Sequence, residues 1–330
     1  MIRGKDIAEM VGVSRQAVTA VLNGSRPNCV SSEKRAEILK IAAEHNYHPN
    51  YAAKALKTGK SNIIGIVMPA WKNPYIAELC TALQQALANE NYTPFFTIDN
   101  NYNPVQNSLE QLLSLQVAGI ITVASSLLPD NIKTPVVSYF YDDPRFDSVC
   151  LNAGVNARQI LEYLKECGHR KIGYLGLSKD RKSKIIFSEA AQLGMELPER
   201  WMVGCDNTLT GEMFDILLEK NRGQDLPTAL IVHNDALALK VMRRIYEHGC
   251  RVPEDFSIIG HDNISYCANS VPALTSLGCG SPDEIAAAMI DLLMKRIKDP
   301  ARPREKIEIK TQVIKRESVL NFNNKKEALK

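Results

Sequence analysis

The stretch Ile7-Ala-Glu-Met-Val-Gly12-Val-Ser-Arg-Gln-Ala-Val18 contains two short segments with helical spacing of apolar residues, separated by a glycine. Gly12 stands where a tight turn needs a residue that tolerates positive φ, and Ser14 suits the N-cap of the second segment. Two helices joined by a short turn with glycine form a helix-turn-helix. Because a third helical segment follows over 32–45, we expect a small all-α head.

An ordinary pair of packed helices has the same spacing, so the polar residues of the second segment decide between the two interpretations. Arg15 and Gln16 lie in its first turn, where Arg can pair with guanine and Gln with adenine. Residues 1–60 hold ten Lys and Arg against five Asp and Glu, whereas residues 61–330 hold 30 against 32. The net charge of +3 is therefore an average over a basic head and a nearly neutral remainder, which favours a nucleic-acid partner for the head.

From residue 62 onward, apolar β-branched runs alternate with amphipathic helical segments, as in parallel sheets wound by right-handed crossovers. The runs are too many for one small sheet and predict two similar α/β lobes that divide near residue 158. The expected strands are 62–69, 93–99, 118–124, 135–141, 148–152, 171–176, 201–204, 228–234, 256–262 and 307–318. Ligands of such sheets bind at the carboxyl ends of the strands, so we expect a cleft there.

The run from Ile7 to Gly24, followed by Tyr47-His-Pro-Asn-Tyr-Ala-Ala-Lys-Ala-Leu-Lys-Thr-Gly59, resembles the head of the LacI/GalR family of bacterial transcription regulators. Similar words continue along the chain, so that the resemblance covers residues 5–320: Asn73–Leu79, Gly168–Ile172, Asn234-Asp235, Gly260–Asp262, Pro272–Thr275 and Arg316–Ser318. It implies a helix-turn-helix DNA-binding domain (1–48), a hinge helix and linker (49–60), and a two-lobed effector-binding and dimerisation domain (61–330). The implied body has the type I periplasmic-binding-protein fold with two parallel sheets, lobe one being about 62–158 and 282–298 and lobe two about 159–278 and 307–320.

The resemblance also implies which residues contact DNA. The base-reading positions fall on Arg15, Gln16 and Ala20, and Ala20 is a departure because many relatives carry Arg there. The positions that resemble phosphate contacts, which fix the register without reading sequence, are Ser14, Thr19, Asn23 and Ser31. In the hinge, Leu56 matches a leucine wedged into the minor groove, with Lys57 beside it and small Ala53 allowing two hinge helices to pack.

The effector-facing positions implied by the resemblance lie at strand ends. They are Trp71, Asn73, Tyr75, Ser125, Tyr139, Asn152, Asn234 and Asp262. Short polar groups such as Asn234 and Asp262 suit the hydroxyls of a small polar ligand, and an aromatic ring such as Trp71 could cover a sugar face.

The expected cleft also departs from the family pattern. The usual Asp-Asn pair reads Asn152-Ala153, the glycine after it reads Asn156, and the word Arg-x-x-Gly-Phe reads Ser183-Lys-Ile-Ile-Phe187. The arginine missing at Ser183 grips the ligand in many sugar-responsive relatives, and Arg181 or Lys184 could replace it. Either the effector is chemically different or effector control has weakened.

Enzymatic, metal and membrane functions find little support. Thr58-Gly-Lys-Ser61 ends like a P-loop, but Lys54 occupies the place of its first glycine. His233 and His261 stand at strand ends, where hydrogen bonds to a ligand are expected, and no Gly-x-Ser-x-Gly motif is present. The eight cysteines show no Cys-x-x-Cys pair and are expected to be buried free thiols. We expect no cofactor, no metal and no membrane span, because no apolar run approaches ~18 residues.

The sequence therefore predicts a cytoplasmic, homodimeric, sequence-specific DNA-binding repressor of transcription. Its expected partners are double-stranded DNA with a pseudo-palindromic operator and a small polar effector, such as a carbohydrate. Two alternatives remain open: an effector-independent repressor, and a solute-binding or sugar-processing protein that uses the same body.

Overall fold

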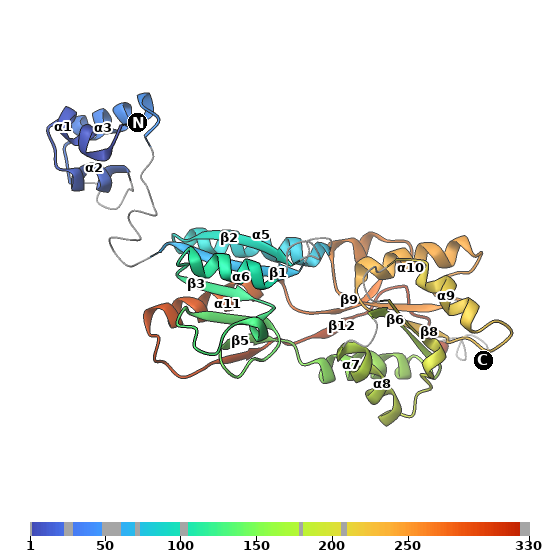
Figure 1. The fold of residues 1–330 in the computed structure, drawn as a ribbon. Coiled ribbons are helices and arrows are strands. Elements are labelled where there is room, and N and C mark those ends of the chain that lie inside the picture. The colour runs from blue at the N-terminus through green and yellow to red at the C-terminus, as the bar shows by residue number, and fades with distance from the viewer. Residues whose placement is uncertain are drawn as a thin grey trace. The chain divides into compact units, whose positions relative to one another are not determined.

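The computed structural model describes residues 2–22, 29–47, 61–69, 73–99, 105–177, 181–205 and 210–323. The chain forms two compact units, Met1–Asn62 and Ile63–Lys330, which we call the head and the body (Figure 1). The expected hinge segment 49–60 lies outside the described residues. So do five of the expected site residues, namely Asn23, Ala53, Leu56, Lys57 and Trp71.

Three helices form the head, as the spacing predicts: α1 (Gly4–Val11), α2 (Arg15–Leu22) and α3 (Ser32–Glu44). Each helix contributes apolar side chains to one small core, whose buried members are Ile7, Ala8, Val11, Val18, Val21, Ile38 and Ala42. The helix-turn-helix interpretation of the fold is thus confirmed.

The turn between α1 and α2 has the local chemistry expected from the sequence. Gly12 adopts the left-handed conformation (φ 65°, ψ 44°), and the Ser14 hydroxyl caps α2 by accepting a hydrogen bond from the Ala17 N–H (3.1 Å). Lys34 Nζ donates to the Gly12 carbonyl (3.2 Å), so α3 also holds the turn. These bonds fix the direction in which α2 leaves the turn.

The body contains two six-stranded sheets, each the centre of one lobe (Figure 1). In the first lobe the order is β11-β5-β4-β3-β1-β2 and the described pairs are parallel, with β1 (Ile63–Pro69), β2 (Thr93–Asp99), β3 (Gly119–Thr122), β4 (Val136–Phe140), β5 (Asp147–Cys150) and β11 (Lys306–Glu308). The helices of this lobe are α5 (Pro74–Asn89), α6 (Val105–Ser114) and α11 (Pro282–Lys298), with a short 3₁₀ turn η1 (Ser125–Leu127).

In the second lobe the order is β12-β10-β9-β8-β6-β7, with β6 (Ile172–Leu177), β7 (Met202–Cys205), β8 (Ala229–Val232), β9 (Ser257–Asp262), β10 (Thr275–Gly278) and β12 (Gln312–Ile314). Its helices are α7 (Ala153–Glu166), α8 (Arg181–Gln192), α9 (Met213–Lys220) and α10 (Asp235–Glu247), and its 3₁₀ turns are η2 (Glu199–Trp201) and η3 (Ser265–Asn269). Strands such as β8 are buried along their whole length, which explains their continuous apolar sequence. The pair β10–β12 is antiparallel, so this sheet is mostly rather than wholly parallel.

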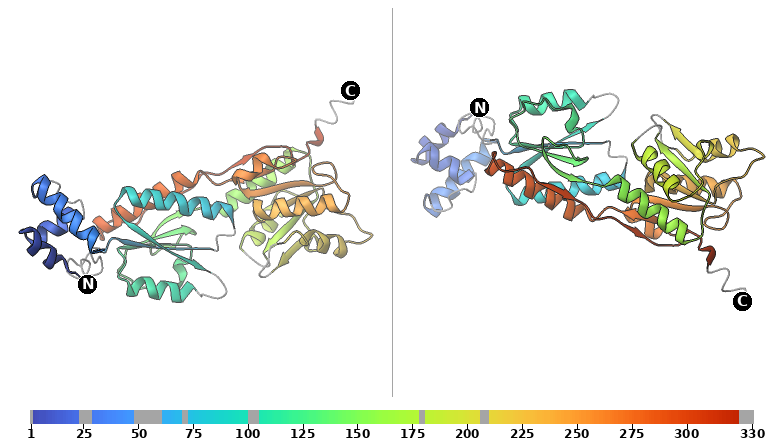
Figure 2. Two further views of the ribbon diagram at one scale, coloured as in Figure 1. Left: turned by 90° about the horizontal axis from the view of Figure 1, so that it is seen from above. Right: turned by 90° about the horizontal axis from the view of Figure 1, so that it is seen from below.

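The chain passes between the lobes three times, between β5 and α7, between β10 and α11, and between β11 and β12. Figure 2 shows the last of these segments, in red, running along both lobes. The first crossing differs from the expected division near residue 158, because α7 packs in the second lobe through Ile160, Leu161 and their neighbours. The expected strand 307–318 is likewise two short strands, one in each sheet.

All eight cysteines are free thiols. Five of them are buried and Cys205 and Cys250 are partly buried, but Cys29 in the head is exposed, which corrects the expectation that all would be buried. In the part of the chain that the structure describes, no helix has both the length and the apolarity needed to cross a bilayer.

Candidate functional site

The exposed face of α2 carries the side chains expected to read DNA. Arg15, Gln16 and Thr19 are exposed and Ala20 is half-buried, whereas Val18 on the opposite face is buried in the head core. The Thr19 hydroxyl donates to the Arg15 carbonyl within the helix (2.9 Å). The structure therefore brings the described base-reading positions together on one accessible helix surface.

Two of the hydroxyls expected at phosphates also cap helices. Ser14 Oγ accepts the Ala17 N–H, and Ser31 Oγ accepts the Lys34 N–H at the start of α3 (3.4 Å). A hydroxyl that accepts one hydrogen bond can still donate its own proton. Ser14 and Ser31 can thus hold their helices and donate to an anionic oxygen at the same time.

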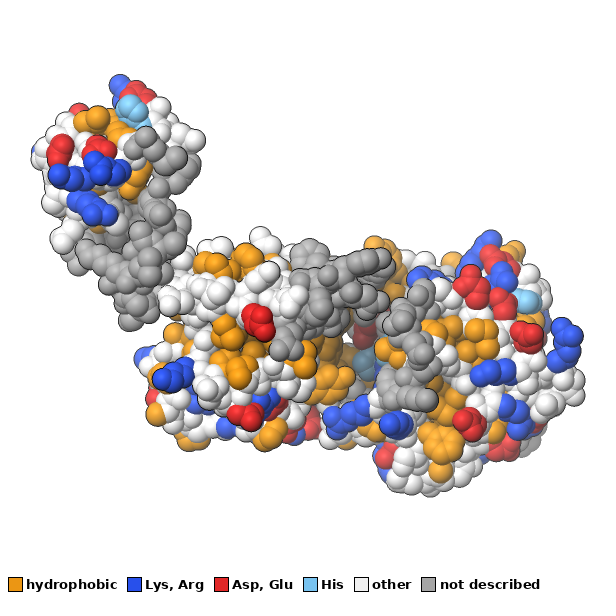
Figure 3. Space-filling model, in the orientation of Figure 1, with side chains coloured by type: hydrophobic (Ala, Val, Ile, Leu, Met, Phe, Trp, Pro, Cys, Tyr) orange, Lys and Arg blue, Asp and Glu red, His pale blue; other side chains and the backbone are white. Residues whose placement is uncertain are grey.

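A cleft of about 680 Å³ lies in the body, lined by residues of both lobes. In Figure 3 an opening between the two halves of the body shows histidine and acidic side chains inside. The cleft is built where strands end and helices begin, as expected for parallel sheets. Of the expected effector residues, four line it: Asn73, Asn152, Asn234 and Asp262.

Three asparagines of the cleft are helix N-caps, which explains their position. Asn73 Oδ1 accepts the Tyr75 N–H (3.1 Å), Asn152 Oδ1 accepts the Val155 N–H (3.2 Å), and Asn234 Oδ1 accepts the Leu237 N–H (2.9 Å). Each cap uses the side-chain oxygen, so the amide nitrogen is left as a donor. The cleft is therefore edged by amide N–H groups held in place by the helices they cap.

The amide nitrogens of two of these asparagines are already engaged. Asn73 Nδ2 donates to Asp262 Oδ2 (2.8 Å), a hydrogen bond between the lobes, and Asn152 Nδ2 donates to Glu308 Oε1 (3.2 Å). The structure records no such partner for Asn234 Nδ2 among the described residues. Asn234 is thus the amide donor of the cleft that is most open to a ligand.

The unusual Asn152 and Asn156 have a local role in this chain. Asn152 donates to Glu308, and Asn156 Oδ1 accepts a hydrogen bond from Thr311 Oγ1 (2.8 Å). Both bonds tie the first turns of α7 to the third crossing of the chain between the lobes. The two residues that depart from the family pattern therefore connect the cleft to the segment between β11 and β12, which joins the lobes.

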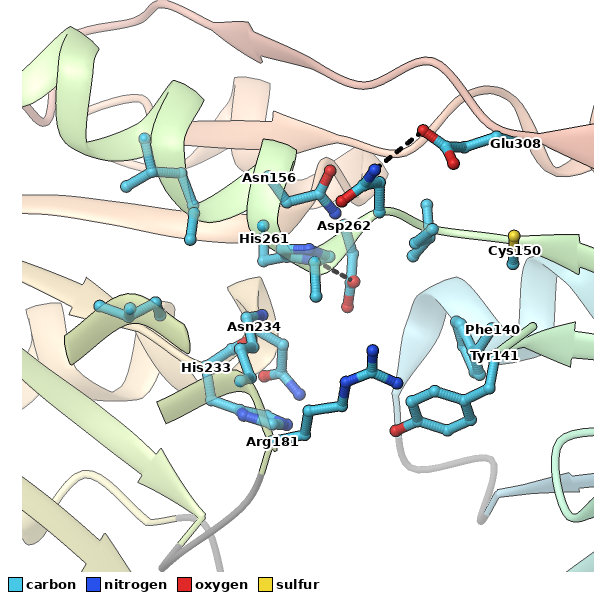
Figure 4. Close-up of a pocket in the computed structure, with 18 of the residues that line it drawn as sticks. Phe140, Tyr141, Cys150, Asn156, Arg181, His233, Asn234, His261, Asp262 and Glu308 are labelled. Atoms are coloured by element: carbon cyan, nitrogen blue, oxygen red, sulfur yellow. Dashed lines mark hydrogen bonds and ion pairs between the residues drawn. The ribbon is translucent and has the colours of Figure 1, made fainter. Parts of the chain in front are cut away.

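Asp262 supplies a carboxylate at the centre of the cleft wall (Figure 4). Its backbone has φ 103°, a rare conformation for a residue with a side chain, and Oδ1 lies 2.8 Å from His261 Nδ1. Burial acts to raise the pKa of Asp262, but the contacts with His261, Lys182 and Asn73 outweigh it, and the pKa is lowered. Burial and the nearby Lys182 lower the pKa of His261. A neutral imidazole then donates to a carboxylate that stays ionised and can accept ligand hydroxyls.

The donor set most suited to a metal in the described residues is His261, Asp262 and Cys279, whose ligand atoms lie within 4.8 Å of one another. Zinc takes ligands of these types. However, the Asp262 carboxylate is already hydrogen-bonded on both oxygens, and the charge of Lys182 acts on all three residues. A nearby cation opposes a divalent ion, so the arrangement fits hydrogen bonding to a ligand better than metal binding.

Three expected effector residues lie away from the cleft wall. The hydroxyls of Tyr75 and Tyr139 are 2.5 Å apart, and both side chains are buried inside the first lobe. Burial raises the pKa of both tyrosines, which keeps them neutral. Ser125 is also buried, with Oγ 3.0 Å from Ser138 Oγ beside a separate hollow. The structure does not bring these three together with Asn234 and Asp262.

The cleft also contains basic and aromatic residues that sequence reasoning left out or only mentioned. Lys182 Nζ donates to the His233 carbonyl (2.6 Å), and Arg181 lies over the ring of Tyr141 at 6.0 Å from its centroid. Lys184, the other candidate to replace the missing arginine, is exposed and is not among the residues that line the cleft. His233 could have been predicted at the cleft from the sequence, because it comes directly after a strand, as Asn234 does.

Asp235, next to Asn234, is buried and connects three elements of the second lobe. Its Oδ1 accepts the Ser276 hydroxyl (2.7 Å) and its Oδ2 accepts the Ile264 N–H (3.0 Å). Burial raises the pKa of Asp235 to about 6, more than these hydrogen bonds lower it. The carboxyl thus connects the starts of α10 and η3 to β10.

This raised pKa predicts a pH dependence of stability. The carboxyl titrates near 3.8 when exposed. Between about pH 4 and 6 the folded state therefore binds the proton more tightly than the unfolded state. The contribution of Asp235 to the free energy of unfolding falls through this window, by an amount on the order of 2 kcal/mol. Urea unfolding of wild type and Asp235→Asn at about pH 4 and 7 measures this, and we expect wild type to lose more stability on raising the pH. Parallel losses in the two proteins would show that Asp235 is ionised throughout.

The sequence matches two described families. Residues 5–50 match "Bacterial regulatory proteins, lacI family", and residues 161–319 match "Periplasmic binding protein-like domain". The HTH-type transcriptional repressor PurR of Glaesserella parasuis serovar 5 (strain SH0165) is 30% identical over 345 residues, which cover 97% of this chain and 98% of that protein. The Ribose operon repressor of Haemophilus influenzae (strain ATCC 51907 / DSM 11121 / KW20 / Rd) is 28% identical over 337 residues, with 96% and 98% coverage.

A solved structure of the Lac repressor dimer, bound to operator and the anti-inducer ONPF, has the same fold. The TM-score is 0.77 at 21% identity, over 97% of this chain and 99% of that one. The order along the chain, a helix-turn-helix head followed by a two-lobed α/β body, is thus shared over the full length.

Proposed function

Because the chain belongs to the LacI family of bacterial regulatory proteins, we propose that it is a sequence-specific DNA-binding repressor of transcription controlled by a small polar effector, such as a carbohydrate. DNA binding is supported by the exposed face of α2, where Arg15 and Gln16 lie in the first turn of a helix that is capped by Ser14. A recognition helix reads base edges in the major groove with such residues.

A second copy of the chain is the partner that the body fits. Large apolar side chains are exposed on the second lobe, with Tyr246 at 69%, Tyr266 at 59% and Val271 at 96% exposure. Tyr246 and Val271 line the same hollow of this lobe, and apolar surface that is contiguous rather than scattered is typical of association sites. A homodimer would present two heads, and its two-fold symmetry matches a pseudo-palindromic operator. The place of action is then the cytoplasm, where the DNA is.

The cleft supports control by a small molecule. Its volume of about 680 Å³ fits a small ligand, and Asn234 and Asp262 offer a donor and an acceptor to hydroxyl groups. The ligand would contact both lobes and compete with the Asn73–Asp262 hydrogen bond that now joins them. We propose that the resulting change in lobe closure is coupled to operator affinity, with a coupling free energy of about 1–3 kcal/mol.

Replacement of Asn234 tests effector control while separating it from stability. Asn234→Ser keeps an oxygen to cap α10 but removes the amide donor, whereas Asn234→Ala removes both. We expect the free energy of unfolding to be about 1 kcal/mol lower in the alanine variant and to equal that of wild type in the serine variant. Both variants should bind effector more weakly than wild type. Thermal unfolding gives the first quantity and calorimetry the second.

The calorimetric titration uses neutral pentoses and hexoses with their acids and phosphate esters. If Asn234→Ser binds the most tightly bound of these compounds as wild type does, then Asn234 is not part of the effector site. If no compound binds wild type or changes its affinity for DNA, the protein is an effector-independent repressor, and the second half of the proposed function is wrong.

A further inference from the structure

The charges that line the cleft are unequally neutralised. Lys306 Nζ lies 3.3 Å from Asp142 Oδ2 and 3.5 Å from Glu308 Oε2, so this cation already faces two carboxylates. Asp142 pairs in addition with Arg304. At this end of the cleft the charges therefore balance within the protein.

The other basic side chains of the cleft stand at the start of α8. Lys182 donates to the His233 carbonyl, and its charge acts on Asp262. Arg181 has no recorded ion pair with a carboxylate in the part of the chain that the structure describes, and its recorded contact is the ring of Tyr141. Among the residues that the structure describes, Arg181 therefore brings a positive charge into the cleft without a matching negative one.

Arg181 is also placed to contact a ligand. Figure 4 shows its guanidinium extending from the start of α8 into the cleft, between Asp262 of the second lobe and Tyr141 of the first lobe. The guanidinium carbon lies over the Tyr141 ring, 6.0 Å from its centroid, at the outer limit of a cation–π contact. A guanidinium offers several N–H donors in a fixed fork, which matches the oxygens of a carboxylate or a phosphate.

We propose that the effector carries an anionic group, a carboxylate or a phosphate monoester, which Arg181 binds with support from Lys182, while its hydroxyls contact Asp262 and Asn234. This inference rests on the proposed effector control. A neutral sugar can accept hydrogen bonds from the guanidinium, but it leaves the positive charge without a counter-ion when the lobes close, and burying an unpaired charge is costly. An anionic ligand instead forms charge-assisted hydrogen bonds across the cleft. Arg181 then supplies, from two residues earlier in α8, the guanidinium that is missing at Ser183.

Matched sets of probes test the charge requirement on the full chain. One set is D-ribose, D-ribonate and D-ribose 5-phosphate, and another is D-glucose, D-gluconate and D-glucose 6-phosphate. Acetate and inorganic phosphate test the anion alone. By calorimetry we expect an anionic member of at least one set to bind tenfold or more tightly than its neutral partner, which equals about 1.4 kcal/mol. Comparing the acid with the phosphate ester distinguishes the two anions.

Variants of α8 assign the effect to Arg181. Arg181→Gln is expected to weaken binding of the anionic probe about tenfold and to change binding of the neutral partner far less, whereas Arg181→Lys keeps the charge and recovers part of the anion affinity. Lys184→Gln is the control, since it removes the same charge from an exposed position of the same helix outside the cleft. We expect it to bind like wild type.

Three results would overturn the inference. The first is that the neutral probes bind as tightly as their anionic partners. Effector control would still stand in that case if the neutral probes altered the affinity for DNA. Equal losses in Arg181→Gln and Lys184→Gln would show an unspecific effect of helix charge. Absence of any Arg181-dependent binding of an anionic probe would also refute it. A failure of every probe to bind or to change DNA affinity would in addition remove effector control itself.

Discussion

Arg15→Ala should weaken binding to the operator by tenfold or more and relax the choice of base at one position of each half-site. Arg15 is exposed in the first turn of α2, and a bidentate Arg–guanine pair contributes about 1–3 kcal/mol of discrimination. The operator used is a duplex selected by the wild-type protein from a random-sequence library. Fluorescence anisotropy gives the affinity, and a second selection with the variant gives the base preference.

Lys40→Ala is the matched control for Arg15→Ala. Lys40 lies on α3 with its side chain 75% exposed, and its Nζ lies 3.9 Å from Glu44 Oε1, a loose ion pair. The control removes one positive charge from the head, so it measures the general electrostatic effect. Equal losses in the two variants, with an unchanged base preference in Arg15→Ala, would show that Arg15 contacts the backbone rather than a base.

Gly260→Ala should unfold the body far more easily than any substitution on the cleft surface. A Cβ at this position in β9 would overlap Asp235 Oδ1 and would lie 3.3 Å from the Asp235 Cα. The carboxylate would have to leave Ser276 and the Ile264 N–H, and each buried group left without its partner costs about 1–3 kcal/mol. We expect a loss of about 3 kcal/mol or more in the free energy of unfolding, measured with urea.

Gly154→Ala controls for the loss of glycine itself. Its Cβ would meet only Asn152 Oδ1 at 3.5 Å, an ordinary contact, and alanine is the better helix former in α7. Its stability should equal or exceed that of wild type. If Gly260→Ala were as stable as this control, then Asp235 would not form the hydrogen bonds with Ser276 and Ile264 that the structure shows.

Features governed by neighbouring residues could be predicted from the sequence. Gly12 and Ser14 were expected at the turn of the head, and the structure confirms both, since positive φ and N-capping depend on local chemistry. The placement of Asn73, Asn152 and Asn234 at the cleft has the same local origin. Each residue caps the helix that follows a strand, at the edge where parallel sheets bind ligands.

Features set by distant packing could not be predicted in this way. The periodicity of α7 shows that one face is buried but not which sheet covers it, so the lobe boundary was expected too late. The segment 307–318 has strand propensity throughout, yet the two sheets share it. Tyr75 and Tyr139 were expected at the cleft, but their hydroxyls pair with each other in the core, which pattern alone does not show.

The charge of the cleft was the feature that was hardest to predict from the sequence. The sequence showed an arginine missing at Ser183 and two candidates to replace it. Only the structure distinguishes Arg181, which lines the cleft, from Lys184, which does not. The departure that left the effector undefined thus becomes a specific expectation about its charge.

We assign DNA binding to the head and not to the body. Anisotropy titrations of the selected duplex with the full chain and with residues 61–330 test it directly, because the body forms a compact unit of its own. We predict tight binding by the full chain, with an affinity that falls steeply as salt rises, and no specific binding by the truncated chain. Equal affinity and an equal salt dependence for the two proteins would contradict the assignment of DNA binding to the head.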